Sequence, residues 1–312
     1  MKVSVIIPVY NKAEYIERCL ENILQQDFDD FEVICVDDGS TDGSGEICNQ
    51  YAGKDHRIQI FHIENSGVTA ARRKGVQLAK GKYIIFVDAD DQLLPGAIKT
   101  LYTEIEETQA DEVIGRFSSQ EGNESPVVFR GDVPDVSLLI VDIVSNRNLF
   151  PVIWGLICRK DLVEDCLDTP RQIVYGEDLM MQLKMLMKHP RVYFISDVVY
   201  LYNMGIPNNR KRTLEHEKRY DAILRKVLEP EWEKYHAAYM FHLIKQYEEF
   251  IVHGDYDVRK AYYNQVISAP LPQGVPMLRR MIWNCPPSLG RVVVWVYRKA
   301  LKIMKRWKHS CV

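Results

Sequence analysis

The feature that most constrains this chain is the alternation of strand and helix patterns over its first hundred residues. Short apolar, β-branched runs are followed by segments whose apolar residues recur every three or four positions, which is the pattern of a helix with one buried face. Alternation at this spacing is typical of an α/β fold with a mostly parallel sheet covered by helices. The predicted strands are 3–9, 31–36, 58–63 and 83–87. The first predicted helix follows Asn11, its expected N-cap, and the next two cover 47–51 and 68–79, the latter ended by Gly81. A fourth predicted helix begins at Pro95.

The pattern becomes less regular after residue 100. We expect strand-like structure over 111–129, a helix over 179–188, two short strands at 192–195 and 198–202, a loop at 204–212 and helices over 215–252. Segments rich in Pro and Gly at 270–276 and 286–290 precede a final helix. These patterns predict a Rossmann-like domain over 1–212, with halves 1–100 and 101–212, and a helical region over 213–312.

Charge and cysteine usage limit the classes of protein to consider. The chain carries a net charge of −3, yet residues 258–312 hold eleven Lys and Arg and no Asp or Glu, an asymmetry typical of interaction regions. Seven Cys without regular spacing predict reduced thiols, with Cys19, Cys35 and Cys48 buried. Since no apolar run approaches the ~18 residues of a spanning helix, we expect a cytoplasmic protein, soluble or peripheral to the membrane.

Two of the predicted strands end in acidic residues. Asp88-Ala-Asp90 follows 83–87, and Asp37-Asp38 follows 31–36. The carboxyl ends of parallel strands meet at one edge of the sheet, where ligands bind, so we expect these carboxylates to lie together. Two carboxylates held on one turn can bind Mg²⁺ or Mn²⁺, because these ions prefer carboxylate oxygens and often complete their coordination with substrate phosphates.

Two local choices stay open at this point. Asp37 and Asp38 are suited either to contacts with a base or ribose or to an Asx turn that caps the next helix. In the helix before Asp88, one of Arg72 and Arg73 could neutralise a diphosphate, whereas a solvated helix face would also account for both. Neither GxGxxG nor GxxxxGK[ST] is present, so we predict neither a Rossmann dinucleotide site nor a P-loop.

Together these segments resemble the family 2 glycosyltransferases. The resemblance is carried by Val3-Ser-Val-Ile-Ile-Pro-Val-Tyr-Asn11, Val36-Asp-Asp-Gly-Ser-Thr-Asp42, Asn65-Ser-Gly-Val-Thr-Ala-Ala-Arg72 and Gly81-Lys-Tyr-Ile-Ile-Phe-Val-Asp-Ala-Asp-Asp91. These motifs stand in the family's order and spacing over residues 1–100, and a weaker likeness continues to residue 205. The resemblance implies a GT-A fold and inverting transfer from a nucleoside-diphosphate sugar, UDP-linked.

The same resemblance implies roles for individual residues. By this likeness, Pro8 and Tyr10 line the base pocket, and Asp38 with Asp37 binds uracil and ribose. Asn65 and Arg72 face the ribose and diphosphate, and Asp88 contacts the sugar or ribose. Asp90 with Asp88 holds a divalent metal, Mn²⁺ or Mg²⁺. The family often has Arg-Asn where this chain has Arg72-Arg73, so the diphosphate contacts depart from its pattern here.

Inverting transfer needs a base that deprotonates the acceptor hydroxyl opposite the leaving diphosphate. Gly176-Glu-Asp178 resembles the family's acidic motif before a helix, which implies Asp178 as the base and Glu177 as the second choice. Without the resemblance, acids here are typical of a capped helix N-terminus. Trp154 and Arg159 resemble the stretch that often lines the acceptor side, although a Trp in a core has the same appearance.

The basic segment 278–308 mixes Lys and Arg with Trp, Tyr and aliphatic residues. This composition suits an interfacial helix on an anionic membrane, and membrane contact fits an acceptor carried on a polyprenyl lipid. Packing of the segment on the catalytic domain and formation of a homodimer are the alternatives. Because the rest of the chain is acidic, we do not expect nucleic-acid binding.

The sequence thus predicts an inverting glycosyltransferase, peripheral on the inner face of the cell membrane, that acts on a glycan or lipid-linked acceptor in polysaccharide or glycolipid assembly. A sugar-1-phosphate nucleotidyltransferase would need a Gly-rich basic loop where this chain has Pro8-Val-Tyr-Asn-Lys12. A degenerate relative that only binds a sugar nucleotide is the other alternative, and the presence of both Asp90 and Asp178 argues against it.

Overall fold

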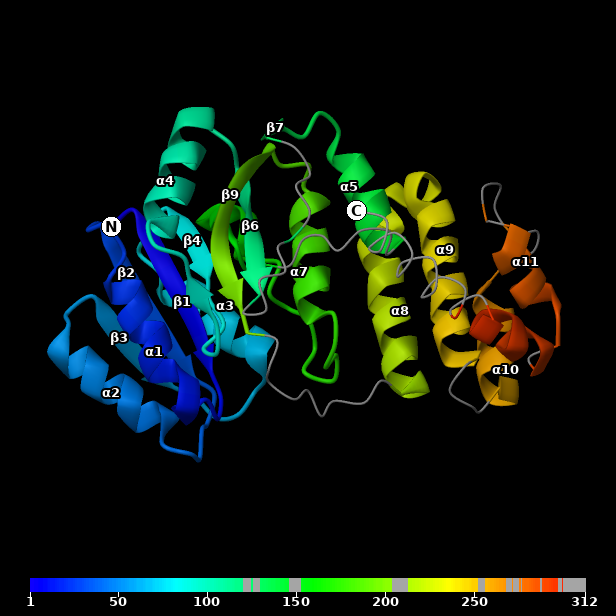
Figure 1. Ribbon diagram of the computed structural model, residues 1–312, viewed down its shortest axis with the longest axis horizontal. Helices are drawn as coiled ribbons and strands as arrows, with labels where there is room; N and C mark the ends of the chain where they lie inside the picture. Colours follow the sequence, from blue (N-terminus) through cyan, green and yellow to red (C-terminus); the bar gives the residue numbers. More distant parts are fainter. Residues whose placement is uncertain are drawn as a thin grey trace. The chain divides into compact units, whose positions relative to one another are not determined.

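The computed structural model describes residues 1–119, 125, 130–145, 153–203, 213–251, 256–267, 271, 275, 277–286, 288–296 and 299. The chain divides into two compact units: Met1–Ile140 with Phe150–Val227, and Val141–Leu149 with Leu228–Val312 (Figure 1). The predicted loop at 204–212 and the basic segment from 300 onward lie outside the described residues.

The first unit is built on one nine-stranded sheet. Its strand order is β3-β2-β1-β4-β8-β6-β9-β5, and β7 pairs with β9. The strands are β1 Val3–Val9, β2 Phe31–Asp37, β3 Ile58–His62, β4 Tyr83–Phe86, β5 Gln92–Leu93, β6 Glu112–Ser119, β7 Gly131–Asp132, β8 Leu156–Arg159 and β9 Val192–Tyr202. The first four strands are mutually parallel, as predicted, whereas β8 runs antiparallel to both β4 and β6. The sheet is therefore mixed, with its parallel half at the amino-terminal end of the chain.

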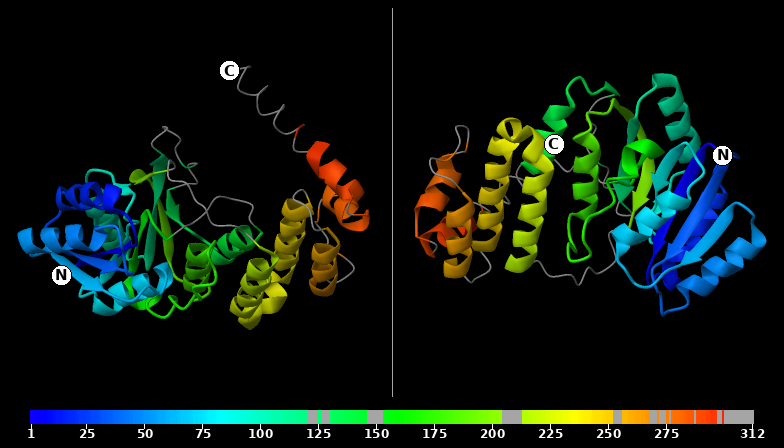
Figure 2. Two further views of the ribbon diagram at one scale, coloured as in Figure 1. Left: turned by 90° about the horizontal axis from the view of Figure 1, so that it is seen from below. Right: turned by 180° about the vertical axis from the view of Figure 1, so that it is seen from behind.

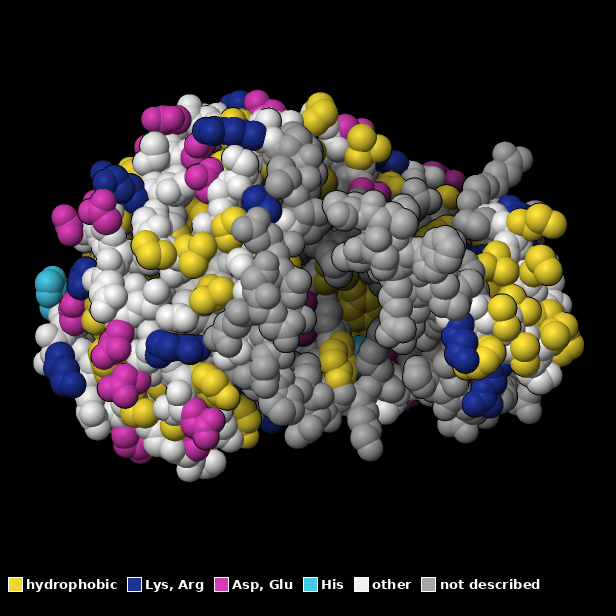
Figure 3. All heavy atoms as spheres, in the orientation of Figure 1, with side chains coloured by type: hydrophobic (Ala, Val, Ile, Leu, Met, Phe, Trp, Pro, Cys, Tyr) yellow, Lys and Arg dark blue, Asp and Glu magenta, His cyan; other side chains and the backbone are white. Residues whose placement is uncertain are grey.

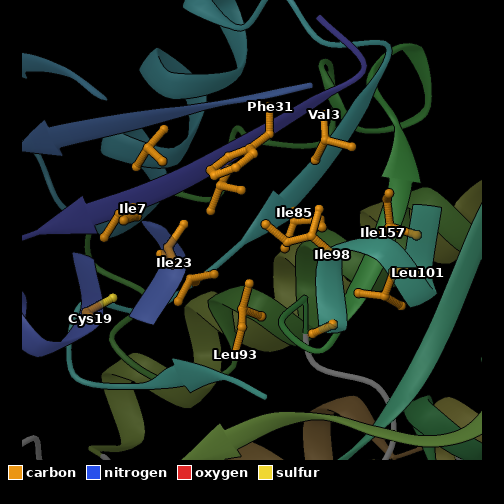
Figure 4. Close-up of a cluster of buried hydrophobic side chains, with 14 of the residues drawn as sticks. Val3, Ile7, Cys19, Ile23, Phe31, Ile85, Leu93, Ile98, Leu101 and Ile157 are labelled. Atoms are coloured by element: carbon orange, nitrogen blue, oxygen red, sulfur yellow. The ribbon is translucent and has the colours of Figure 1, made fainter. Parts of the chain in front are cut away.

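Helices cover both faces of this sheet (Figures 1 and 2). Those in the first unit are α1 Ala13–Leu24, α2 Ser44–Lys54, α3 Val68–Leu78, α4 Ala97–Thr108, α6 Lys160–Val163, α7 Glu177–Leu186 and α8 Leu214–Leu228, and α5 Val136–Val144 crosses the boundary between the units. The side chains of α1 and α4 pack against alternate residues of β1, such as Val3 and Ile7, and bury the core drawn in Figure 4. On the other face, α3 lies so close to β1 that a side chain at Gly75 would overlap Ile6.

Several predicted boundaries are wrong for identifiable reasons. Asn11 does not cap α1, because its backbone adopts φ 51° and its side-chain oxygen accepts a hydrogen bond from Thr41 N instead. Pro95 precedes the helix rather than opening it, since Gly96 is the N-cap of α4. The two strands expected at 192–202 form the single strand β9, whose register shifts against β6 interrupt the apolar alternation.

Gly81 does not terminate α3 as a left-handed C-cap. Its amide donates to Ser4 Oγ at 2.9 Å, and its Cα packs on the backbone of β1, where a Cβ would approach Ser4 N to 2.6 Å. The glycine is therefore needed for close packing at the amino edge of the sheet. Cys19, Cys35 and Cys48 are buried free thiols, which confirms that prediction.

The second unit is helical in its described residues. It contains η1 Glu229–Glu231, α9 Trp232–Ile251, α10 Tyr256–Val266, α11 Met277–Asn284 and a further helix over 288–296. Aromatic rings join them: Tyr247 of α9 meets Tyr263 of α10 and Trp283 of α11 edge to face. Across the described residues, no helix is both long and apolar enough to span a bilayer.

Candidate active site

The carboxyl ends of β1, β2 and β4 bring the predicted donor-side residues to one edge of the sheet. Val9 is in register with Asp37, and Ile6 is in register with Phe86 on the other side of β1. The residues that follow these strands therefore start from adjacent positions, as the parallel-sheet argument predicts. Pro8 is buried within β1, whereas the Tyr10 side chain just beyond it is 48% exposed and available to a ligand.

Asp37 and Asp38 shape the loops at this edge. Both oxygens of Asp38 accept backbone hydrogen bonds, from Ser66 N at 2.6 Å and Gly67 N at 2.8 Å. Asp37 accepts from Ser40 N at 3.0 Å and contacts His62 Nδ1 at 2.8 Å. Burial disfavours the ionised Asp37 carboxylate, but these two partners outweigh it and hold its pKa below the ordinary value. In this structure, both carboxylates therefore accept hydrogen bonds from the backbone of the surrounding loops. A nucleotide bound at this edge would contact those loops.

Asn65 lies in the loop that Asp38 holds. Its side-chain and backbone oxygens both accept hydrogen bonds from Arg171, a residue distant in sequence. This loop also approaches Gly39, which has φ 74° and whose missing Cβ would lie 3.1 Å from Asn65 N. The turn after β2 therefore needs glycine both for its backbone conformation and for its packing against Asn65.

Arg72 links the donor-side aspartates to helix α7. It is 3% exposed, its Nη2 donates to Asp88 Oδ1 at 2.8 Å, and its Nη1 lies 3.9 Å from Glu177 Oε1. Its Nε and Nη1 have no hydrogen-bond partner among the described residues. Arg73 on the same helix is exposed, so Arg72 is the arginine of this pair that lies buried beside Asp88.

Asp90 forms an ion pair with Lys12, whose backbone amide is in turn held by Ser44 Oγ at 2.8 Å. The Asp90 side chain is 17% exposed and that of Asp88 is 28% exposed, so both can reach a ligand. The described residues contain no cluster of three or more His, Cys, Asp or Glu side chains able to hold a metal on their own. Two accessible carboxylates fit a cation that arrives with phosphate oxygens and water, and they do not fit a metal held by protein ligands alone.

Asp91 is a site residue that the sequence argument did not single out. It is 2% exposed and accepts hydrogen bonds from Tyr200 Oη at 2.8 Å and Asn203 N at 2.7 Å. Burial, together with the charge of Asp88, raises its pKa to about 7. The adjacent acids were visible in the sequence, but the turn after β4 decides which carboxylate points inward.

Asp178 and Glu177 begin helix α7, facing Arg72. Gly176, the N-cap, has φ 75°, and a Cβ there would lie 2.9 Å from the ring of Tyr220. Asp178 accepts from Leu179 N at 2.8 Å. Burial raises the pKa of Asp178 even though the Arg72 charge opposes the shift. A carboxylate with a raised pKa has the properties required of a general base.

A second unanticipated group holds the start of α7 in place. His216, buried near the start of α8, accepts a hydrogen bond from Tyr175 N at 3.3 Å through Nε2. Its Nδ1 lies 3.3 Å from Glu217 Oε1, which assigns the ring proton to that side when His216 is neutral. The sequence offered no signal for this role, because the spacing of His216 matches no motif.

The two residues expected on the acceptor side have different locations. Trp154 stacks on Tyr200 and Tyr202 at centroid distances of 4.8 and 5.1 Å and meets Phe117 edge to face, so it is built into an aromatic cluster. Trp154 is partly buried in this cluster. The cluster includes Tyr200, whose hydroxyl donates a hydrogen bond to Asp91, so its packing positions that hydroxyl.

Arg159 does not reach the site. It is in register with Tyr83, the first residue of β4, whereas Asp88 lies beyond the last residue of that strand. At ~3.3 Å per residue the separation along the strand is roughly 16 Å. Arg159 instead pairs with Asp161 at 2.6 Å and lies 3.5 Å from Asp111. The antiparallel direction of β8, which the sequence did not reveal, places it at the opposite edge.

Comparison with known proteins identifies relatives of one kind. The family described as glycosyl transferase family 2 matches residues 4–148. Glycosyltransferase GlyG of Streptococcus pneumoniae serotype 4 is 34% identical over 212 residues, which are 64% of this chain and 70% of GlyG. A poly(ribitol-phosphate) beta-glucosyltransferase of Bacillus spizizenii is 32% identical over 208 residues, but this chain spans only 32% of its length.

The fold has solved counterparts. The crystal structure of Staphylococcus aureus TarS in complex with UDP-GlcNAc superposes with a TM-score of 0.76, covering 96% of this chain and 92% of that one at 23% sequence identity. A mannosyltransferase of Pyrobaculum calidifontis in complex with GDP-Man and Mn²⁺ matches with a TM-score of 0.51 at 18% identity. These likenesses show the architecture, which is that of a GT-A glycosyltransferase.

Proposed function

Because this chain belongs to glycosyltransferase family 2 and is a glycosyltransferase of the GT-A fold, we propose that it transfers a sugar with inversion from a UDP-linked donor to a hydroxyl group of an acceptor. The observation that carries this proposal is Arg72, which contacts Asp88 on the donor side and lies 3.9 Å from Glu177 at the start of α7. One buried cation thus joins the two acidic groups that the reaction needs.

The nucleotide would occupy the loops that follow β1 and β2. Tyr10 is exposed beside the loops that Asp37 and Asp38 hold, and its ring offers a flat apolar surface to a base. The similar structure of S. aureus TarS was solved with UDP and with UDP-GlcNAc, which supports a uridine nucleotide as the first donor to test. Asn65 and Arg72 lie next along this edge, where ribose and diphosphate would follow.

A divalent metal, Mn²⁺ or Mg²⁺, fits this donor site. Asp90, together with Asp88, would hold it through carboxylate oxygens, and phosphate oxygens and water would complete its coordination. When bound, such an ion neutralises charge on a diphosphate leaving group. For Asp90 to take this role, its ion pair with Lys12 has to open.

In the transfer step, Asp178 accepts the proton of the acceptor hydroxyl. The acceptor oxygen forms a bond to the anomeric carbon while the bond from that carbon to the diphosphate oxygen breaks, so the nucleoside diphosphate leaves with the bonding pair. Arg72 keeps its charge beside the diphosphate and beside α7 during this exchange. The raised pKa of Asp178 matches it to the weakly acidic hydroxyl that it deprotonates.

The acceptor is a glycan or a lipid-linked glycan on the cytoplasmic side of the membrane. The sequence relatives that act on poly(ribitol-phosphate) support an acceptor that displays repeated hydroxyl groups. We assign no acceptor contact to Arg159, which lies at the opposite edge of the sheet.

Calorimetric titration of UDP into the full chain, with and without Mn²⁺, tests the donor site. Wild-type protein should bind UDP more tightly with the metal, and Asp90→Ala should remove that difference. Asp29→Ala is the matched control, because Asp29 is exposed and precedes β2 at the opposite edge. Binding of UDP that ignores both the metal and Asp90 would contradict the metal assignment, and binding restricted to other nucleotides would contradict the choice of donor.

A further inference from the structure

Exposed apolar side chains are concentrated in one short segment of the second unit. Among the described residues, nine large hydrophobic side chains are exposed, and six of them fall between residues 277 and 296. The six are Met277 (78%), Met281 (52%), Leu289 (54%), Val292 (55%), Trp295 (52%) and Val296 (52%). Such a concentration marks an interaction surface, whereas single exposed apolar residues need no explanation.

The spacing of these residues places them on the outer sides of two helices. Met277 and Met281 are four residues apart on α11, and Leu289, Val292 and Val296 recur at three- and four-residue intervals on the helix 288–296. The inner sides are buried, with Ile282 2% and Val294 3% exposed. Both helices therefore carry apolar side chains on an inner, buried side and on an outer side that is exposed among the described residues. Figure 3 shows hydrophobic side chains gathered over this part of the molecule, with Lys and Arg at the margin.

Every charged residue within α11 and the helix 288–296 is basic. From residue 258 to the end of the sequence there is no Asp or Glu. Arg291 and Lys299 are exposed beside the apolar residues, and the Lys299 ammonium lies 4.1 Å from the centroid of the Trp295 ring. Arg280 is partly buried, and its Nε donates to Val275 O at 3.0 Å. Arg279, by contrast, points inward and pairs with Glu248 at 2.9 Å.

We propose that α11 and the helix 288–296 form a membrane-docking face, which binds the surface of an anionic lipid bilayer. An apolar side flanked by cations, with a Trp at the boundary, matches the chemistry of a bilayer interface, where apolar side chains enter the acyl boundary and cations remain among acidic headgroups. A soluble protein partner could bind the same apolar side chains, but such binding would not require that the charged residues on these two helices all be basic. This face is independent of the proposed transfer reaction, and it would hold the enzyme beside a lipid-linked acceptor.

Vesicle flotation of the full chain tests the membrane-docking face. Wild-type protein should float with phosphatidylcholine vesicles that contain phosphatidylglycerol and should remain behind with vesicles of phosphatidylcholine alone. The apolar variant Leu289→Ser with Trp295→Ser should lose flotation. The charge variant Arg291→Gln with Lys299→Gln, at two exposed positions, should weaken it by about tenfold or more, because each basic group near such a surface contributes roughly a fivefold factor. Leu138→Ser, at an exposed Leu of the first unit, is the matched control and should float like wild type.

Three outcomes would overturn the proposal: equal flotation of wild type and both variants, equal binding to neutral and anionic vesicles, or a wild-type dimer that the apolar variant dissociates while vesicles bind neither protein. Far-UV circular dichroism and thermal unfolding of each variant show whether it is folded. If folded wild-type protein floats as expected but fails to bind UDP, the proposed function is contradicted and the membrane-docking face stands. If it binds UDP but does not float with anionic vesicles, the membrane-docking face is contradicted and the proposed function stands.

Discussion

Arg72 and Asp88 form an ion pair in which the arginine side chain is 3% exposed and the N–O distance is 2.8 Å. A buried guanidinium is costly to desolvate unless its charge and its donors are used. Here only one nitrogen donates a hydrogen bond, and Nε and Nη1 have no partner among the described residues. Asp88 and the nearby Glu177 are anions that this buried arginine faces, and under the proposed function the donor diphosphate would be a further one.

We therefore expect Arg72→Lys to reduce transfer strongly, by about 100-fold or more in kcat/KM, because a lysine cannot replace a planar group that serves two anions at once. Steady-state kinetics and UDP titration would measure the effect. Arg73→Lys is the natural control, since Arg73 is exposed on the same helix. Equal activity of the two variants would refute the role of Arg72.

Asp178→Asn should keep UDP affinity and lose about 10²- to 10⁴-fold in kcat, since the amide cannot accept the proton of the acceptor hydroxyl. The pKa of Asp178 is raised, so the wild-type rate should increase with pH through a limb that lies above the ordinary Asp pKa of 3.8. A kcat–pH profile would locate this limb. If Glu177→Gln cost more activity than Asp178→Asn, the base would have to be reassigned to Glu177.

Lys12→Met should increase the affinity of the free protein for Mn²⁺. The Lys12 ammonium pairs with Asp90, so a cation has to displace it before the carboxylate can bind metal. Calorimetric titration of Mn²⁺ without nucleotide would show the change directly. Lys99→Met, which breaks an exposed pair with Asp27, should leave Mn²⁺ binding unchanged. Weaker binding of Mn²⁺ by Lys12→Met would show that the pair supports the site rather than competing for it.

Glu112 is expected to make stability depend on pH. It is fully buried, accepts from Gln182 Nε2 at 2.7 Å, and burial raises its pKa from 4.5 to about 7. Because the pKa of Glu112 is higher in the folded protein than in the unfolded chain, binding of a proton to Glu112 stabilises the fold. This contribution to the free energy of unfolding is complete below the unfolded pKa of 4.5 and is lost as the pH rises through about 7. Its Oε2 and Gln182 Oε1 both lack partners among the described residues, and a proton on Glu112 supplies the missing donor.

Glu112→Gln should then raise the free energy of unfolding at about pH 8, by up to roughly 3 kcal/mol, and change it little at about pH 5. Denaturant unfolding at both pH values would measure this, with Glu107→Gln on the exposed side of α4 as the control. Destabilisation by Glu112→Gln at the higher pH would mean that burial does not penalise the Glu112 carboxylate and that its folded-state pKa is not raised.

Much of the parallel half of the sheet was predictable because it depends on local spacing. Apolar runs of strand length and helical repeats placed β1 to β4 and α1 to α3 within a few residues of their observed bounds. The acidic strand ends followed from the same reasoning, since parallel strands bring their carboxyl ends to one edge. A predicted helix bound was wrong where a contact with a residue distant in the sequence replaced a local cap. This is the case for Asn11, whose side-chain oxygen accepts a hydrogen bond from Thr41 N.

The sequence by itself determined the family, the donor-side edge and the acidic residues that stand there, because these depend on residue identity and short-range periodicity. Only the tertiary structure decided which of Arg72 and Arg73 is buried, that Asp91 points inward, and that Arg159 lies at the far edge on the antiparallel strand β8. The physical reason is that burial and ion pairing are set by neighbours distant in the chain. A local pattern does not contain those neighbours until the strands have paired and the helices have packed upon them.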